Sequence, residues 1–314
     1  MKKIITVIGG CGFTGTQLVN KLLLSGYKVN VIDNQMFGRN LRQHKNLFIT
    51  KLDIRKHNKL DFKNSSTIIH LANIANDPGV ELSPLLSWET NVLASKFIIE
   101  RAIKDKVKKF IFASSGSVYG FKKEKKVTEN LDLEPISYYN KTKMIAERVF
   151  MSYSDDIQTF IIRPATVCGI SNRMRLDVSV NALTYSALSK KKITVFGGSQ
   201  IRPNIHIDDL IDVYIHFLKN SIKPGIYNAG FENLSINQIA KIVRQFIPCK
   251  IEKTKTNDIR SYRLNSDKLI QTGFKPKYNI TKAILDMIEE YKKGKLVAKD
   301  IFYTVNWMKK NNFK

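Results

Sequence analysis

Apolar residues occur along the first 164 positions in short β-branched runs that alternate with stretches of helical spacing. The first run, Ile4 to Ile8, has the composition of a buried parallel strand. Strands that alternate with helices predict a parallel sheet wound on both faces. We predict strands at 4–8, 28–32, 47–50, 67–72, 109–115 and 159–162, and helices over 83–106 and 139–153. A further helix follows the first strand, where Leu18, Val19, Leu22 and Leu23 recur at helical spacing before Gly26.

Beyond Pro164 the pattern is less regular. Residues 165–204 are mixed, and later stretches predict a strand and helix over 204–218, a short strand at 226–228, and helices at 235–246 and 281–291. We therefore predict an α/β chain with a Rossmann-type doubly wound parallel sheet and a smaller mixed C-terminal substrate lobe. The sheet domain comprises residues 1–164, with a return around 205–228; the lobe comprises 165–204 and 229–314.

Between the first strand and its helix, Gly9, Gly12 and Gly15 follow the spacing G-x-x-G-x-x-G. Glycine permits a tight turn and a close approach of the backbone to a pyrophosphate, and the helix N-terminus favours negative charge. A plain βα turn also collects glycine, but the flanking strand and helix favour dinucleotide binding. Asp33 follows 18 residues after Gly15, where an acid binds the adenosine ribose. Its carboxylate favours NAD, whereas Arg39 keeps NADP as an alternative.

Charge and cysteine content narrow the other possibilities. The net charge of +25 comes mainly from scattered lysines without interleaved aromatics, which favours a solvated surface over a nucleic-acid interface. Apolar runs stay well short of the ~20 residues of a membrane span, and the N-terminal run ends too early for a signal peptide. The three cysteines are odd in number and widely spaced. They predict a reduced cytoplasm and no metal site.

Candidate catalytic residues lie at the end of the fifth predicted strand and at the start of the following helix. Tyr139 and Lys143 are four residues apart and so share one helix face, and Ser115 is at the adjacent strand end. A lysine ammonium beside a phenol lowers the pKa of the phenol, as a general base on a sugar hydroxyl requires. The alternative is an exposed Tyr–Lys pair, which the glycine turn and Asp33 argue against.

With these residues in place, the chain resembles the extended short-chain dehydrogenase/reductases of the nucleotide-sugar epimerase/dehydratase type, which include UDP-galactose 4-epimerases. The resemblance runs from Lys3 to about Lys293. It rests on the motifs GGCGFTG, LDIR, HLAN, ETNVLAS, SSGSVYG, YNKTK, RPATVCG, RPNIHIDD and DIRSYRLNSDKL.

The resemblance implies a role for each matching residue. Tyr139 would be the base, Lys143 its ribose-binding partner, Ser115 the third member of the triad, and Asn91 a residue near the active site. The implied NAD contacts, besides Tyr139 and Lys143, are Gly9, Gly12, Phe13, Thr14, Gly15, Asp33, Asn34, Asp53, Ile54, Leu71 and Ala72. The implied substrate contacts are Ser117, Thr166, Asn181, Arg202 and Arg260. Arg202 and Arg260 would bind the diphosphate, with surface ion pairs as the alternative.

Departures from the family pattern refine the prediction. The 4,6-dehydratases carry an Asp-Glu pair where this chain has Gly116 and Ser117, which do not transfer protons near neutral pH. Thr166 replaces an asparagine and Cys168 a tyrosine of many epimerases, so the identity of the sugar stays open. The tail from 295 to 314 extends beyond the family core, and we expect it to pack on the protein rather than to contact a membrane surface.

We therefore predict NAD-dependent epimerisation of a nucleotide-diphosphate sugar through transient oxidation at C4. The alternative is an NAD(P)H-dependent reductase of a nucleotide-linked 4-keto-6-deoxy sugar. A non-enzymatic dinucleotide sensor would not need Ser115, Tyr139 and Lys143 together. The resemblance further implies a cytoplasmic homodimer, formed through helices at 91–103 and 144–153, that supplies surface polysaccharide synthesis.

Overall fold

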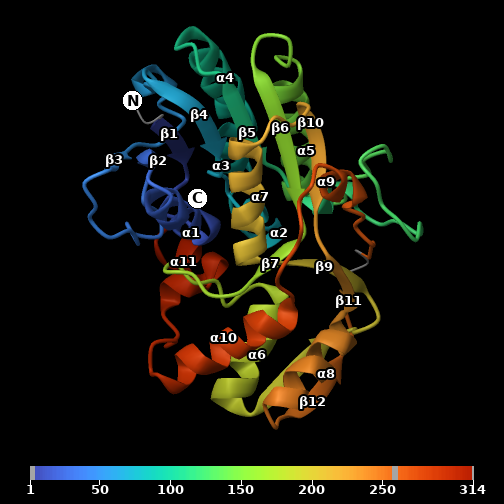
Figure 1. Ribbon diagram of the computed structural model, residues 1–314. Helices are drawn as coiled ribbons and strands as arrows, with labels where there is room; N and C mark the ends of the chain where they lie inside the picture. The colour runs from blue at the N-terminus through green and yellow to red at the C-terminus, as the bar shows by residue number, and fades with distance from the viewer. Residues whose placement is uncertain (1–3, 257–260, 313–314) are drawn as a thin grey trace.

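The computed structural model describes residues 4–256 and 261–312, and its central feature is a seven-stranded parallel sheet (Figure 1). The strand order is β10-β6-β5-β4-β1-β2-β3. The order reverses at β1, which pairs with both β2 and β4, and ligands of such sheets bind at the carboxyl ends of the strands beside this reversal. The strands are β1 Ile4–Ile8, β2 Lys28–Asp33, β3 Leu47–Lys51, β4 Ser65–His70, β5 Lys109–Ala113, β6 Gln158–Pro164 and β10 Gly225–Ala229. The predicted fold class is confirmed.

Helices cover both faces of the sheet and enclose two apolar cores. Helices α1 and α7 cover one face, and α4 and α5 cover the other. Their bounds are Phe13–Leu24 for α1, Ala94–Lys104 for α4, Tyr138–Met151 for α5 and Ile207–Lys219 for α7. Strand side chains alternate between the cores: Ile111 packs on the α1 side, whereas Phe110 and Phe112 pack on the α4 side. Both faces of the strands are buried, which explains their continuous apolar runs.

The second lobe lies below the sheet in Figure 1 and has its own apolar cluster. In its three-stranded sheet, β9 pairs with β11 antiparallel and with β7 parallel; β8 and β12 form a parallel pair. The strands are β7 Thr166–Cys168, β8 Lys192–Phe196, β9 Ile201–His206, β11 Glu232–Ser235 and β12 Lys250–Thr254. The helices are α6 Ser179–Lys190, α8 Ile236–Phe246, α9 Asp267–Gln271, α10 Ile280–Lys292, a 3-10 turn Asp300–Phe302 and α11 Thr304–Lys310.

The stretch 83–106, predicted as one helix, is three segments. Helix α3 (Pro84–Trp88) leads into a π-helical turn at Glu89–Leu93, and α4 follows. The π turn contains Asn91, whose side chain bonds the backbone of Ile74. A further short helix, α2 (Asp77–Leu82), was not predicted; the side chain of Asn76 caps it. Short 3-10 turns occur at His57–Lys59 and Gly116–Tyr119.

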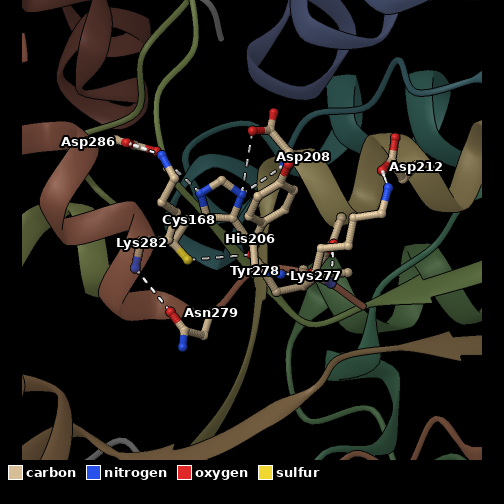
Figure 2. A network of polar contacts seen from close by, with 12 residues as sticks. Cys168, His206, Asp208, Asp212, Lys277, Tyr278, Asn279, Lys282 and Asp286 are labelled. Carbon is tan, nitrogen blue, oxygen red and sulfur yellow. Dashed lines mark hydrogen bonds and ion pairs between the residues drawn. The ribbon is translucent and has the colours of Figure 1, made fainter. Parts of the chain in front are cut away.

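Polar contacts join the sheet half to the second lobe (Figure 2). His206, at the end of β9, accepts a hydrogen bond at Nδ1 from the backbone N–H of Asp208 at 3.1 Å, which caps α7. Its Nε2 lies 3.8 Å from Asp286 of α10. Lys277, just before α10, pairs with Asp212 of α7 at 2.8 Å. These contacts hold α7 and α10 on opposite sides of the end of β9.

In the described part of the chain, no helix has the length and apolar character that crossing a bilayer requires. Within residues 4–256 and 261–312, His, Cys, Asp and Glu side chains do not gather in groups of three or more that could hold a metal ion.

Candidate active site

The glycine turn between β1 and α1 is packed tightly on one side and open on the other. A Cβ on Gly9 would lie 2.5 Å from the backbone nitrogen of Ala72, and one on Gly15 would lie 2.3 Å from the carbonyl oxygen of Gly9. A Cβ on Gly12 would meet only that carbonyl oxygen, at 3.5 Å. No side chain caps the start of α1. The turn therefore presents open backbone and a helix N-terminus, as a pyrophosphate group requires.

Asp33, at the end of β2, is held by backbone donors. Its two carboxylate oxygens accept hydrogen bonds from the N–H groups of Cys11 at 2.9 Å and Gln35 at 2.6 Å. Burial raises the pKa of Asp33, and these two bonds oppose the rise. An ionised carboxylate has further lone pairs for ribose hydroxyls. Asp33 lines a small cavity of about 110 Å³ together with five other predicted NAD contacts, Asn34, Asp53, Ile54, Leu71 and Ala72.

A larger cavity of about 640 Å³ lies between the glycine turn and the second lobe. This volume is in the usual range for small-molecule and cofactor sites, about 300–1,000 Å³. The predicted residues that line it are Gly9, Gly12, Phe13, Thr14, Gly15, Leu71, Ser115, Ser117, Tyr139, Lys143, Thr166 and Arg202. The open glycine turn and Asp33 fit a dinucleotide that lies along the two cavities. NAD is thus compatible with the residues present.

Tyr139 and Ser115 meet in this cavity. Tyr139 is in the first turn of α5, whose N-terminus is capped by the hydroxyl of Ser137. Burial is the largest cause that raises the pKa of Tyr139 to about 12; the negative charge of Asp77 adds to it, and a hydrogen bond with Ser115 opposes it. The Ser115 hydroxyl lies 2.8 Å from that of Ser117. A phenol and a hydroxyl therefore share one small polar site in an otherwise buried region.

Lys143 differs from our expectation. Its Nζ donates a hydrogen bond to the carbonyl of Ala113 at 2.6 Å and lies 4.7 Å from the ring centroid of Phe112, but 5.9 Å from that of Tyr139. Burial lowers the pKa of Lys143 to about 7, and Glu147 opposes this. The expected lowering of the Tyr139 pKa by this ammonium is therefore wrong for the protein in this structure, because burial dominates both groups.

Two predicted site residues lie behind the cavity wall. Asn91 accepts from the N–H of Ile74 at 2.8 Å and donates to its carbonyl and to the hydroxyl of Thr142, both at 3.1 Å. Asn181 bonds the backbone of Gly169 and Arg175 with both ends of its amide. Both side chains are buried and hold loops, and neither is among the residues that line the two cavities. Arg260 lies outside the described residues.

The loop that Asn181 holds contributes cavity residues that our sequence reading missed. Arg173 is 2% exposed, with its guanidinium 4.1 Å from the ring centroid of Phe37. Its terminal nitrogen donates to the hydroxyl of Thr304 at 3.1 Å, whereas its Nε has no partner among the described residues. Burial, followed by repulsion from Arg175, lowers the pKa of Arg173 to about 9. The charge cluster in RMRLD is the sequence signal that would have pointed here.

The C-terminal tail also lines the larger cavity, through Tyr303, Thr304, Val305, Asn306 and Met308. The tail packs on the protein, as expected, with Phe302 and Met308 buried. Its place at the cavity was not predicted. The spacing of Phe302, Val305 and Met308 is the helical signal that could have shown an inward face.

Comparison with known proteins supports this description. Residues 5–230 match the model of the family described as "NAD dependent epimerase/dehydratase family". The UDP-glucose 4-epimerase of Lactobacillus helveticus is 26% identical over 309 residues, which cover 87% of this chain and 92% of that protein. The UDP-glucuronic acid decarboxylase 1 of Xenopus tropicalis is 23% identical over 256 residues, covering 78% and 61%.

Among solved structures, the UDP-glucose 4-epimerase of Thermotoga maritima with UDP-glucose superposes with a TM-score of 0.84 at 24% identity. The match covers 93% of this chain and 99% of that one. The names of these relatives describe more than one reaction, but the family model and the structural similarity point to the same family. Since the family model spans well over half of the sequence, the chain belongs to the NAD-dependent epimerase/dehydratase family.

Proposed function

We propose that this protein is an NAD-dependent nucleotide-sugar 4-epimerase. The observation that supports this proposal most directly is the lack of an acid–base pair at Gly116 and Ser117, directly after Ser115. A Cβ on Gly116 would lie 3.3 Å from both the carbonyl oxygen of Pro164 and the hydroxyl of Tyr262. The next residue, Ser117, donates its hydroxyl to Asn140 at 2.7 Å. The positions that carry the acid–base pair of dehydratases thus lack its side chains, and at 116 an added side chain would be crowded by its neighbours.

The groups that remain suit a reaction confined to one carbon of the sugar. Held by the glycine turn and Asp33, NAD would supply the acceptor and donor of a hydride at sugar C4. The proposal requires Tyr139 to ionise when cofactor and substrate are bound, because burial raises its pKa in the protein alone. Its phenolate would then take the proton of the 4-hydroxyl as the C4–H bond breaks, which leaves a 4-keto sugar. Ser115, hydrogen-bonded to Tyr139, holds the same oxygen. After the 4-keto sugar has turned its opposite face toward the nicotinamide site, hydride would return to C4 and Tyr139 would return the proton to the 4-oxygen. The reaction therefore consumes no external reductant.

Binding of the nucleotide diphosphate is assigned to Arg202. Arg202 lines the cavity from β9, in the second lobe. A guanidinium binds phosphate oxygens in a bidentate manner. Lys143, directed to the strand end at Ala113, is assigned to the nicotinamide ribose, as the family pattern implies.

A reaction in D₂O tests the proposal. UDP-glucose, UDP-N-acetylglucosamine and UDP-glucuronic acid are incubated separately with the protein, without added cofactor, and followed by NMR. We expect at least one of them to give its 4-epimer with no deuterium on carbon, since the hydride returns within one active site. Deuterium at C5 or C6 would indicate dehydration chemistry, loss of carbon dioxide would indicate a decarboxylase, and a requirement for stoichiometric NAD(P)H would indicate the reductase. Each of these results contradicts epimerisation.

The variant Tyr139→Phe tests the base. Removal of the hydroxyl should lower turnover by at least about a hundredfold, the usual contribution of general base catalysis. NAD content, measured by mass spectrometry of the denatured protein, should be unchanged. Tyr138→Phe is the matched control, because Tyr138 is the preceding residue and half exposed. Retention of activity by Tyr139→Phe would show that another group is the base.

We also propose a cytoplasmic homodimer. The free thiols Cys11 and Cys168 are buried, which suits a reducing compartment. Leu93 is 59% exposed at the start of the predicted dimer helix 91–103. Light scattering after gel filtration measures the mass of the particle, and Leu93→Lys should shift it toward the monomer if this helix forms the interface. A monomeric native protein would contradict the proposal.

A further inference from the structure

Residues 299–310 form what we term the C-terminal strap. It comprises the 3-10 turn Asp300–Phe302 and helix α11, and it follows α10 of the second lobe. Figure 1 shows α11 between the second lobe and α1 of the sheet half. The strap supplies five residues to the lining of the large cavity, to which the glycine turn and Tyr139 also contribute. It is therefore part of the wall around the site that we assign to NAD.

On the side of the sheet, the strap is attached to the segment that follows Asp33. The indole N–H of Trp307 donates to the carbonyl of Met36 at 2.9 Å. Met308 is 1% exposed and packs with Ile74 and Val80, which follow β4. Both attachment points lie just past strand ends at the reversal of strand order. The strap thus spans the crevice in which sheets of this type bind dinucleotides.

On the side of the second lobe, the strap is attached to the loop 169–178. The backbone N–H of Thr304 donates to Asp177 at 2.9 Å, and the carbonyl of Phe302 accepts from the N–H of Leu176 at 3.0 Å. The Thr304 hydroxyl accepts from Arg173 at 3.1 Å. The strap is therefore held at both ends by a small number of hydrogen bonds, with its middle over the cavity.

We propose that the strap closes over bound NAD and sets the rate at which NAD leaves. The inference rests on the placement of NAD given with the proposed function, and it holds for any reaction of this family. NAD bound between the glycine turn and Tyr139 would have the strap residues 303–308 as a further wall of its site. Release then requires the strap to detach from both Met36 and Arg173. An epimerase gains from this arrangement, because its NAD is not exchanged during turnover.

The dissociation rate of NADH tests the strap directly. Protein loaded with NADH is mixed with excess NAD in a stopped-flow instrument, and the loss of bound-NADH fluorescence gives the rate. Trp307→Phe keeps an aromatic side chain and removes the bond to Met36, while Thr304→Val removes the hydroxyl that bonds Arg173 and Asp177. Each variant should make the strap open at least about fivefold more often and speed release by that factor. The double variant should release NADH about 25-fold faster, if the two bonds contribute independently.

Two controls keep the outcome interpretable. Lys309→Ala changes an exposed residue of the same helix and should leave the rate unchanged. A chain that ends at Phe302 keeps that buried residue and removes α11, and it should release NADH faster than the double variant. If the double variant and the shortened chain both have a native circular dichroism spectrum and release NADH at the native rate, the strap does not control NAD release and the proposal is wrong. Failure of the native protein to bind NADH at all would instead overturn the NAD site of the proposed function.

Discussion

Replacement of Lys143 by methionine should make the nucleotide-free protein more stable at pH 6 while abolishing its activity. Lys143 is 3% exposed, and burial lowers its pKa from 10.5 to about 7. At about 1.4 kcal/mol per pKa unit, this corresponds to a cost of about 5 kcal/mol for the buried ammonium. Methionine of similar length avoids that cost but loses the hydrogen bond to Ala113 and the contact with Phe112, each worth about 1 kcal/mol. The net gain at pH 6 is about 3 kcal/mol.

The gain should depend on pH in a definite direction. Between pH 7 and pH 10.5 the unfolded chain binds more protons at Lys143 than the folded protein, so the stability of the native protein rises with pH in this window. Below pH 7 the lysine is charged in both states and the whole cost remains. At pH 9 about 3 kcal/mol has been recovered, and the variant and the native protein should be about equally stable.

Thermal unfolding at pH 6 and pH 9, followed by circular dichroism on protein freed of nucleotide, measures the effect. The variant should melt about 5 °C or more above the native protein at pH 6, for a gain of this size. Lys141→Met is the matched control, since Lys141 is exposed on the same helix and should show neither effect. A variant that melts below the native protein at pH 6, or a difference that is equal at both pH values, would refute the reasoning.

Two further results are expected from the structure. Gly12→Ala should keep the native melting temperature but weaken NAD binding by at least about tenfold. Gly15→Ala should instead lower the melting temperature, because its Cβ would overlap the carbonyl oxygen of Gly9. Equal effects of the two substitutions on the melting temperature would contradict this. Glu147→Gln should cost about 3–5 kcal/mol in urea unfolding, since it leaves the buried guanidinium of Arg163, now 2.7 Å from Glu147, without its counter-charge. A loss below about 1 kcal/mol would show that the pair is not needed for stability.

Much of the fold followed from the sequence because its strands are buried on both faces. Runs such as Ile4–Ile8 are apolar at every position, and each predicted strand of the large sheet is present with its ends shifted by at most two residues. Helix α8 was predicted to begin at Ser235, and the structure has a complete capping box at this residue. Local sequence determines such features, since they depend on neighbouring residues only.

What was missed depends on contacts between distant segments. The π-helical turn at Glu89–Leu93 keeps a helical pattern in sequence and is visible only through the bonds of Asn91 to Ile74. The family pattern placed Asn91 and Asn181 near the site, yet only the structure shows that their amides are occupied by backbone. The position of Arg173 in the cavity depends on how the loop 169–178 crosses toward Phe37. No local periodicity reports these arrangements.

The outermost strand of the sheet has a consequence for how the protein is made. Strand β10 pairs along β6, but its residues, Gly225–Ala229, are synthesised only after the first strands of the second lobe. Until β10 emerges from the ribosome, β6 is an open edge, and until α7 emerges shortly before it, Phe160 and Ile162 lack the cover of that helix. Open apolar edges pair readily with other chains. The sheet is therefore completed late in translation. A chain truncated after residue 164 would be an aggregation-prone fragment rather than a smaller nucleotide-binding protein.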